Sequence, residues 1–464
     1  MGPTVRSFSA DIEPLRLIAR FPDIYPGLLE SSAPLGARAH PGGRFDVLPM
    51  SSGECLRLDS QRRLSGPHAA GAEGFLSALE AWWGALRQPS VAAPLPFTGG
   101  WLLYLGYELA TEIETRLKLP PSPDSVIALA IRAPAAWVRD RATMQAWLVA
   151  EPGAEALLDA FENHVRESAA PRSAAPRPAA ASRCAQLEVL EEDPARFLES
   201  VSRALDYTAA GDVYQTNLSR QWQVRSDLSP DPVSIYERLR STNPSPFAAM
   251  MRYGDFALMS SSPERLLSIR GGIVSTRPIA GTRPRGTSPE TDAALVESLL
   301  NNEKERAEHV MLIDLERNDL GRVCVGGTVR VDEYMVLETY AHVHHIVSNV
   351  SGRLREDASP VRVIRALFPG GTITGCPKVR CMEIIAELEG AGRGAYTGSI
   401  GYLNRDGSCD LNILIRTLTS HAASLAPITF RAGAGIVADS IPSQELAETR
   451  AKALGMLRAL DSSC

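Results

Sequence analysis

Apolar runs of two kinds alternate along the chain and predict a mixed succession of strands and helices. Short runs bounded by Gly and Pro are typical of buried strands, as in GGRFDVLPM, VIALAIRAPAAWVRD and PFTGGWLLYLGYELATEIE, the last running into a helix. A helical stripe of apolar residues predicts one long helix from about Thr291 through the segment EKERAEHVMLIDLERN. Its apolar positions are Leu295, Leu299, Met311, Leu312 and Leu315.

Turn residues separate further elements. DPARFLESVSRALDYTAAGDVYQTNLSRQWQV predicts a helix and then a strand that carries Gln215. GAYTGSIGYLNRDGSCDLNILIRTL predicts a hairpin turned at residues 405–408, with Tyr396 and Arg416 on its strands. In GGTITGCPKVRCMEII a Gly-rich turn leads to a helix that starts near Pro377, where free N–H groups suit a carboxylate or a phosphate. The spacing does not match GxxxxGK[ST], so we reject a nucleotide P-loop.

The chain divides into three regions by composition. Residues 1–167 form a mixed α and β region whose residue spacing defines no catalytic chemistry. Residues 168–186, SAAPRSAAPRPAAASRCAQ, are rich in Ala, Pro, Ser and Arg and predict a linker or an exposed crossing. Residues 187–464 form an α/β region with more conspicuous turns and no evident internal repeat.

Composition narrows the class of protein. The formal net charge is only −6 over 464 residues, which argues against a general nucleic-acid binder. The seven Cys are odd in number and scattered, and Cys376 with Cys381 is the only close pair, so we expect reduced thiols and no zinc site. The sequence shows no apolar signal core and no run long enough for a membrane span. We therefore expect a cytoplasmic protein without nucleic-acid or membrane partners.

Two pairs of carboxylates share one spacing. Glu305 and Glu308 lie three residues apart on a predicted helix, so they point from one face. Taken alone, this pair is more typical of a solvated helix face. Glu445 and Glu448 repeat the spacing on a second predicted helix near the end of the sequence. Two such pairs suit Mg²⁺, which takes one or two carboxylates together with waters and the oxygens of an anionic substrate.

For other polar residues, spacing alone gives weaker evidence of a catalytic or metal-binding role. Glu264, in an SSPE turn, is either a surface acid or a proton donor, and the residues alone favour the surface. The segment AHVHHIV contains His342, His344 and His345, but alternation along a strand makes a three-His metal site awkward. One inward histidine that donates a hydrogen bond or carries a proton is the better interpretation.

Seven motifs in series resemble one family. SSPERLL, RPIAGTRPRG, EKERAEHVMLIDLERNDLGRV, GGTITGCPKVRCMEII, GSIGYL, LIRTL and RAGAGIVADS resemble the chorismate-utilising enzymes, which include anthranilate, aminodeoxychorismate, isochorismate and salicylate synthases. The resemblance is strong over residues 187–460 and weaker before them. It implies an α/β (α+β) fold, in which antiparallel β-sheets pack face to face as a sandwich surrounded by helices, with the active site in a cleft.

The resemblance also implies roles for particular residues. Glu308 and Glu448 would bind Mg²⁺, while Glu305 and Glu445 would hold metal-bound waters. Glu264 would be the general acid that protonates the departing hydroxyl, because hydroxide is a poor leaving group. His345 would be the active-site histidine. The residues expected to bind chorismate are Gly281, Thr282, Thr372, Tyr396, Arg416, Gly433, Ala434 and Gly435.

The residue at position 215 indicates the nucleophile. Water-adding members of the family carry a Lys there as general base, whereas this chain has Gln215, as the ammonia-adding members do. Amination of chorismate is therefore favoured. The chain has no Gly-x-Cys-x-Gly motif of a fused glutaminase, so we expect a separate glutamine amidotransferase subunit to supply ammonia.

The sequence is compatible with two ammonia-adding branches of the family. The N-terminal elements resemble component I of aminodeoxychorismate synthase, which aminates C4 for 4-aminobenzoate and folate synthesis, and we favour this branch. Ala280 stands where well-studied members of that branch have Lys, and PIAGT matches component I of anthranilate synthase, the alternative. Ser31, with Pro244, Ser245 and Pro246, resembles the family's tryptophan pocket. A non-catalytic scaffold is disfavoured because Glu264, Glu308 and Glu448 are all present.

Overall fold

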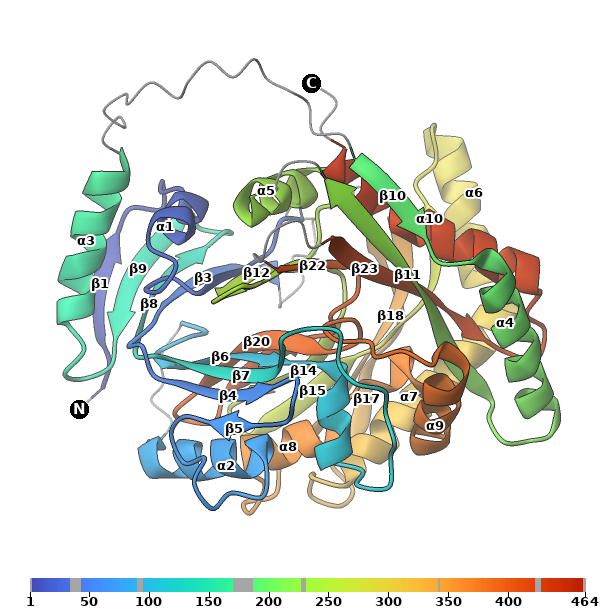
Figure 1. Cartoon of the computed structure of the whole chain (residues 1–464), viewed down its shortest axis with the longest axis horizontal. Helices are drawn as coiled ribbons and strands as arrows, with labels where there is room; N and C mark the ends of the chain where they lie inside the picture. The colour runs from blue at the N-terminus through green and yellow to red at the C-terminus, as the bar shows by residue number, and fades with distance from the viewer. Residues whose placement is uncertain are drawn as a thin grey trace.

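Two antiparallel sheets lie face to face, with helices on the outer face of each (Figure 1). The computed structural model describes residues 2–33, 43–89, 95–169, 187–226, 231–340, 343–421 and 427–461. The expectation of an antiparallel sandwich surrounded by helices is confirmed.

The first sheet has twelve strands in the order β1-β9-β8-β3-β2-β12-β13-β22-β23-β11-β10, with β19 paired to β11. Each of its neighbouring pairs is antiparallel. The strands are β1 (Thr4–Phe8), β2 (Gly27–Glu30), β3 (Phe45–Met50), β8 (Ala135–Asp140), β9 (Gln145–Ala150), β10 (Leu187–Glu191), β11 (Gln215–Ser226), β12 (Phe247–Tyr253), β13 (Phe256–Ser262), β19 (Gly375–Cys376), β22 (Thr417–His421) and β23 (Ile428–Ile436).

The second sheet has eleven strands in the order β16-β18-β15-β14-β21-β20-β6-β7-β4-β5, with β17 paired to β18. Its pairs are also antiparallel. The strands are β4 (Cys55–Asp59), β5 (Leu64–Ser65), β6 (Gly100–Leu105), β7 (Val126–Ala133), β14 (Arg265–Arg270), β15 (Ile273–Arg277), β16 (Ile279–Pro284), β17 (Arg330–Thr339), β18 (Val343–Arg353), β20 (Ser399–Asn404) and β21 (Cys409–Asn412).

Both sheets mix strands from the two ends of the sequence. In the first sheet β2 pairs with β12, which sets Leu28 opposite Met250. In the second, β6 pairs with β20, which sets Leu103 opposite Gly401. Residues 1–167 therefore share both sheets with the C-terminal region.

Helices flank the two sheets. They are α1 (Pro14–Arg20), α2 (Phe75–Leu86), α3 (Ala156–Ala169), α4 (Pro194–Ala209), α5 (Pro232–Thr242), α6 (Pro289–Leu300), α7 (Glu303–Gly321), α8 (Pro360–Leu367), α9 (Lys378–Glu389) and α10 (Pro442–Leu460), with 3₁₀ helices η2 (Tyr107–Glu112) and η3 (Gly371–Ile373). Apolar side chains of α1, α3, α5 and α10 pack on the first sheet, and those of α2, α7 and α8 pack on the second.

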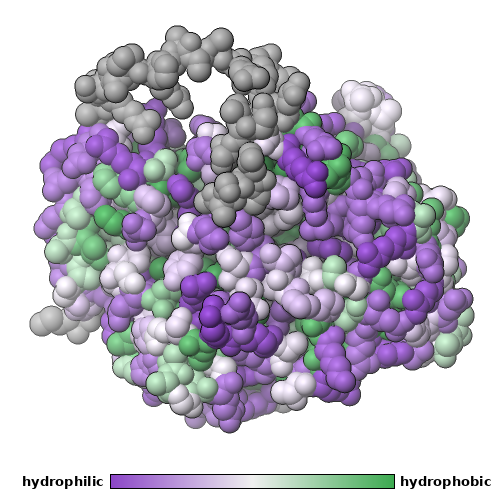
Figure 2. All heavy atoms as spheres, in the orientation of Figure 1, coloured by the Kyte–Doolittle hydropathy of each residue, from purple (hydrophilic) through white to green (hydrophobic). Residues whose placement is uncertain are grey.

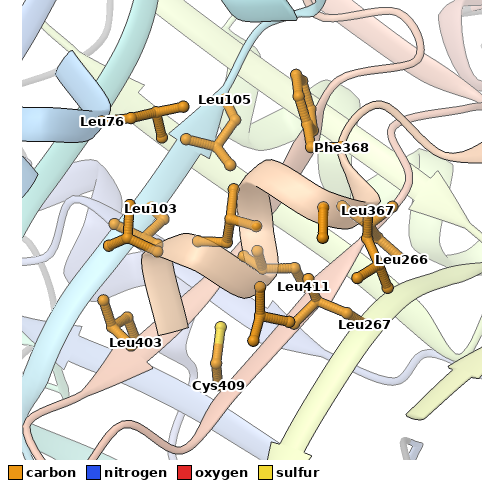
Figure 3. Close-up of a cluster of buried hydrophobic side chains, with 14 of the residues drawn as sticks. Leu76, Leu103, Leu105, Leu266, Leu267, Leu367, Phe368, Leu403, Cys409 and Leu411 are labelled. Atoms are coloured by element: carbon orange, nitrogen blue, oxygen red, sulfur yellow. The ribbon is translucent and has the colours of Figure 1, made fainter. Parts of the chain in front are cut away.

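The core has separate apolar layers. Between the sheets, Leu102 and Leu129 of the second sheet share a cluster with Met251 and Leu258 of the first. Beneath the second sheet, side chains from distant segments meet around α8, as Figure 3 shows. Burial of these residues stabilises the fold by about 25 cal/mol for each Å² of apolar surface removed from water.

Three expected elements differ from the structure in their extent or type. The long helix from Thr291 is wrong, because α6 ends at Leu300 and α7 begins at Glu303. Asn302 starts the new helix, and its side chain accepts a hydrogen bond from the Glu305 amide at 3.0 Å. The helix after β6 is a 3₁₀ helix, η2. The run VIALAIRAPAAWVRD forms two strands, β7 and β8.

The remaining differences concern a hairpin and the linker. Tyr396 and Arg416 lie outside the strands, in the turn before β20 and between β21 and β22. Helix α3 extends to Ala169, two residues into the predicted linker, and residues 170–186 lie outside the described part.

On the face drawn in Figure 2, hydrophobic residues are scattered among hydrophilic ones. Within the described ranges, no helix combines the length and the apolar character that crossing a bilayer requires.

Candidate active site

Gln215 and Glu308 meet where β11 begins and α7 passes. The Gln215 side-chain amide donates a hydrogen bond from Nε2 to Glu308 Oε1 at 2.6 Å. Gly435 of β23 lies against this pair, since a Cβ at position 435 would stand 2.3 Å from Gln215 Nε2 and 3.7 Å from Glu308 Oε1. Gly435 leaves the space that the Gln215 amide occupies, and the sheet and the helix together build this part of the site.

The second carboxylate pair lies on α10, along the same strand. Glu448 forms an ion pair with Lys452 at 2.6 Å, and the Lys452 ammonium donates a hydrogen bond to the Gly433 carbonyl at 2.9 Å. Gly433 and Gly435 are two residues apart on β23, which corresponds to roughly 7 Å along a strand. The structure thus brings the two predicted acidic helices to one end of β23.

Lys452 is a site residue that the sequence analysis missed. Its positive charge lowers the pKa of Glu264, so it lies within electrostatic range of that carboxyl group. The signal was present in the sequence, because Lys452 follows Glu448 by four residues on one helix face.

Carboxylate oxygens are the protein groups that this site offers to a divalent cation. Among the described residues, no group of three His, Cys, Asp or Glu side chains is placed to hold a metal ion. Mg²⁺ does not need such a cage, because it binds through one or two carboxylates, waters and substrate oxygens. Glu305 Oε2 is buried and has no hydrogen-bond partner within the described ranges, while its Oε1 accepts from Arg283 at 2.6 Å. Glu305 Oε2 is thus a carboxylate oxygen of the kind that Mg²⁺ prefers, and Mg²⁺ binding stays a prediction.

Glu264 is buried between β13 and β14, so the expectation of a surface acid is wrong. Burial raises the pKa of Glu264 to about 7, and the charge of Glu316 raises it further, whereas the Thr372 side chain lowers it. In the part of the chain that is described, Glu264 Oε1 has no hydrogen-bond partner. A buried carboxyl group that keeps its proton near neutral pH is suited to act as a general acid.

A neutral histidine and an arginine lie near this acid. His345 Nδ1 and the Thr282 hydroxyl are hydrogen-bonded at 2.8 Å. Burial lowers the pKa of His345 to about 3, and the charge of Arg416 lowers it further, so the imidazole is neutral at pH 7. Burial also lowers the pKa of Arg416, while the charge of Glu264 raises it. An arginine in this setting can bind a carboxylate through two parallel hydrogen bonds.

Strand β16 has an irregularity at Gly281, between Ala280 and Thr282, and it packs on α7. Gly281 has φ of +75°, and a Cβ there would stand 2.8 Å from Glu305 Oε2. His344, the neighbour of His345 on β18, bonds Asp292 at 2.9 Å, so it has a structural contact away from His345. His342 lies outside the described residues.

The other residues that were expected to bind chorismate lie in different surroundings. The Tyr396 hydroxyl lies against β23, since a Cβ at Gly433 would stand 2.5 Å from it. Thr372 lies in η3, close enough to Glu264 to affect its pKa. Ala434 is fully buried in an apolar cluster with Leu218. Because strand residues alternate, its methyl group points away from the face of Gly433 and Gly435.

Ala280 is buried on β16, opposite Ile346 of β18. Its methyl group offers no nucleophile, so the structure supplies no replacement for the family lysine at this position.

The segments expected to form a tryptophan pocket lie together. The Ser245 amide donates to the Ser32 hydroxyl at 2.8 Å, and the Ser32 amide donates to the Ser245 carbonyl at 2.9 Å. Pro246 lines a cavity of about 60 Å³ between the sheets, with Glu30 and Phe247. Tryptophan binding stays a prediction.

The arrangement is suited to an anionic, oxygen-rich ligand. It places a protonated carboxyl group, a neutral histidine and an arginine beside acidic side chains that suit a cation. Comparison with known proteins agrees, because the model of the family described as chorismate binding enzyme matches residues 58–458. The chain belongs to the chorismate binding enzyme family.

Relatives carry two different names. Aminodeoxychorismate synthase component 1 of Bacillus subtilis is 52% identical over 268 residues, which cover 58% of this chain and 56% of that protein. Anthranilate synthase component 1 of Pseudomonas aeruginosa is 38% identical over 438 residues, covering 90% and 87%. The crystal structure of anthranilate synthase component I from Streptococcus pneumoniae TIGR4 superimposes with a TM-score of 0.77 at 31% identity, covering 91% and 94%. The particular member is left unresolved by these names.

Proposed function

We propose that the chain is component I of aminodeoxychorismate synthase, which replaces the C4 hydroxyl of chorismate by an amino group and releases water. The product is 4-amino-4-deoxychorismate, a precursor of 4-aminobenzoate and folate. Ammonia comes from a separate glutamine amidotransferase subunit. The observation that carries amination is Gln215, which is held against Glu308 and cannot serve as the base that a lysine provides.

The side chains have distinct tasks in this proposal. Glu264 gives its proton to the departing hydroxyl as the C–O bond breaks, and burial keeps that proton available near neutral pH. Arg416 binds a substrate carboxylate. Gln215 Oε1, which is buried and lacks a partner among described residues, can accept a hydrogen bond from ammonia as the C–N bond forms. The proton that ammonia loses offsets the one that Glu264 donates.

Magnesium completes the proposed site. Glu308 and Glu448 would bind Mg²⁺, with Glu305 and Glu445 near its waters. When bound, the ion supplies positive charge that neutralises a substrate carboxylate and fixes its orientation.

The second candidate is component I of anthranilate synthase, in which the amine enters at C2 and pyruvate is lost. Ala280 favours it, because an alanine cannot make the attack on the ring that the lysine of well-studied C4-aminating members is thought to make. The relatives' names support both candidates.

One assay tests both candidates. Purified protein is incubated with chorismate, Mg²⁺ and an ammonium salt at alkaline pH, without a partner subunit, and chorismate is followed by chromatography. We expect chorismate to be consumed, and Glu264→Gln to consume far less. No loss of chorismate with the unchanged protein would refute the enzyme assignment.

The product then separates the branches. A product that becomes 4-aminobenzoate only after an aminodeoxychorismate lyase is added supports the C4 assignment. Direct appearance of anthranilate fluorescence would overturn it in favour of the second candidate.

A further inference from the structure

The N-terminal region binds the turn that carries Tyr396. Three successive backbone amides of this turn donate to buried carboxylates. The Arg393 amide donates to Glu108 Oε1 at 2.7 Å, the Gly394 amide donates to both Glu108 oxygens at 3.2 Å, and the Ala395 amide donates to Asp124 at 2.7 Å. Consecutive N–H groups that converge in this way form an anion-binding concavity. Two side chains from residues 1–167 therefore fill it.

The backbone of η2 also bonds to the turn that carries Tyr396. The Tyr107 amide donates to the Gly394 carbonyl at 2.8 Å. Gly394 has φ of +59°, and a Cβ there would stand 2.3 Å from Asp124 Oδ2. The turn therefore has little freedom to move away from Glu108, Tyr107 and Asp124.

The Arg393 side chain connects the restrained turn to the ring of Tyr396. Its guanidinium lies 5.1 Å from the ring centroid of Tyr107 and 5.4 Å from that of Tyr396. It also forms a buried ion pair with Glu389 at 2.6 Å, and Glu389 accepts from Arg431 of β23 at 3.1 Å. Breaking such a buried network would leave an unpaired charge, which is strongly destabilising. The position of Tyr396 over β23 is thus fixed through Arg393.

We infer that Glu108 is a positioning residue, which sets the Tyr396 hydroxyl against Gly433 for substrate binding. The inference rests on the proposed function, because it assigns the benefit to chorismate. It also explains why the site needs residues 1–167, in which sequence patterns defined no chemistry. Burial raises the pKa of Glu108 to about 7, although the amides of Arg393 and Gly394 lower it. Above neutral pH the Glu108 carboxyl group is therefore ionised, and both of its oxygens can accept hydrogen bonds.

A matched control lies on the same 3₁₀ helix. Glu112 accepts hydrogen bonds from two amides, those of Phe75 at 2.9 Å and Leu76 at 3.0 Å. These amides belong to the start of α2, under the second sheet, and not to the Tyr396 turn. Glu112→Ala removes the same kind of contact as Glu108→Ala, without touching the turn.

The experiment compares Glu108→Ala, Glu108→Gln and Glu112→Ala in the full chain. For Glu108→Ala we expect the KM for chorismate to rise about tenfold with kcat changed much less, which corresponds to about 1.4 kcal/mol. Glu108→Gln keeps an acceptor for the Arg393 amide and should recover most of the affinity. Glu112→Ala should lower the melting temperature and leave KM unchanged.

Hydrogen exchange at the amides of residues 394–396 gives a second readout, independent of chorismate. We expect faster exchange there in Glu108→Ala and not in Glu112→Ala. Unchanged exchange in Glu108→Ala, or an equal rise of KM in Glu112→Ala, would overturn the inference. An unchanged protein that does not consume chorismate would instead refute the proposed function, while the exchange data would still decide whether Glu108 holds the turn.

Discussion

Gln215 Nε2 and Glu308 Oε1 are joined by a hydrogen bond of 2.6 Å. The bond connects the start of β11 to the second turn of α7, and it restrains a carboxylate that we propose to bind Mg²⁺. Glu308 has a neutral, amide partner here, so its charge is not cancelled by Gln215. The carboxylate remains suited to a cation, which gives the first prediction.

Gln215→Glu should make the protein depend on Mg²⁺ for stability. It would place a second carboxylate against Glu308, and the loss of the hydrogen bond with the added repulsion should cost about 1–3 kcal/mol in the free energy of unfolding. Bound Mg²⁺ would relieve the repulsion. We therefore expect a lower melting temperature without Mg²⁺ and a larger rise with added Mg²⁺ than in the unchanged protein.

Gln223→Glu is the control for this measurement. It introduces the same charge on β11, where Gln223 contacts Gln221 at 3.4 Å. An equal response of both variants to Mg²⁺ would argue against a cation beside Glu308.

Glu448→Ala should abolish turnover and barely change stability. The Glu448 side chain is 49% exposed, so we expect a change of less than about 0.5 kcal/mol in the free energy of unfolding. Turnover at limiting Mg²⁺ should fall by at least about 100-fold. Glu383→Ala, at a helix glutamate 36% exposed and paired with Arg380, is the control. Full activity of Glu448→Ala at low Mg²⁺ would refute its assignment as a ligand.

Activity should fall as pH rises above the pKa of Glu264, about 7. The general acid acts in its protonated form, so kcat/KM at constant free ammonia should decline by up to about tenfold per pH unit above that value. Glu264→Gln should show low activity without this decline. A profile of the unchanged protein that stays level to pH 9 at constant free ammonia would contradict the assignment.

Glu264 should also make stability depend on pH. Its pKa in the folded state, about 7, lies above the ordinary value of 4.5, so between these values the folded protein holds a proton that the unfolded chain releases. Stability is therefore fully present below the ordinary value and is lost as pH rises through the folded value, by up to roughly 3 kcal/mol. Chemical denaturation at pH 5 and pH 8 should show a smaller difference for Glu264→Gln.

Gly435→Ala should displace the Gln215 amide. The added Cβ would stand 2.3 Å from Gln215 Nε2, so the Gln215 side chain must shift, and we expect its hydrogen bond to Glu308 to weaken or break. We expect a loss of about 1–3 kcal/mol in stability together with a loss of amination. Gly84→Ala, in α2 with open space around its Cβ position, should instead stabilise by about 0.5–1 kcal/mol. Wild-type activity in Gly435→Ala would show that the Gln215 position does not matter.

Much of the fold and of the site was predictable because local chemistry decides it. Turn residues and apolar runs located several strands, among them β3, β6 and β11, and the motif series indicated the family and its sandwich of sheets. The paired spacing of Glu305 with Glu308, and of Glu445 with Glu448, identified two acidic helix faces. Each of these features depends on residues that are close together along the chain.

The two wrong predictions, of one long helix and of a surface position for Glu264, share a physical cause. The break between α6 and α7 was hidden, because the apolar stripe continues past Asn302, and only the capping contact to Glu305 shows that a new helix begins. Glu264 was placed at the surface, because a turn acid is usually solvated. Its burial comes from packing between strands of both sheets, which no local pattern encodes.

The sequence by itself determined which chemical groups this protein has: four carboxylates at helical spacing, a glutamine where a lysine would add water, and a glycine-rich strand. Only the tertiary structure decided how they act, because burial sets the proton affinity of Glu264, and the pairing of β11 with β23 together with the packing of α7 brings Gln215, Gly435 and Glu308 together. The contact of Glu108 with the turn that carries Tyr396 was likewise decided by the tertiary structure alone. Hydrogen bonds and desolvation depend on distances between segments remote in sequence, and those distances exist only in the folded chain.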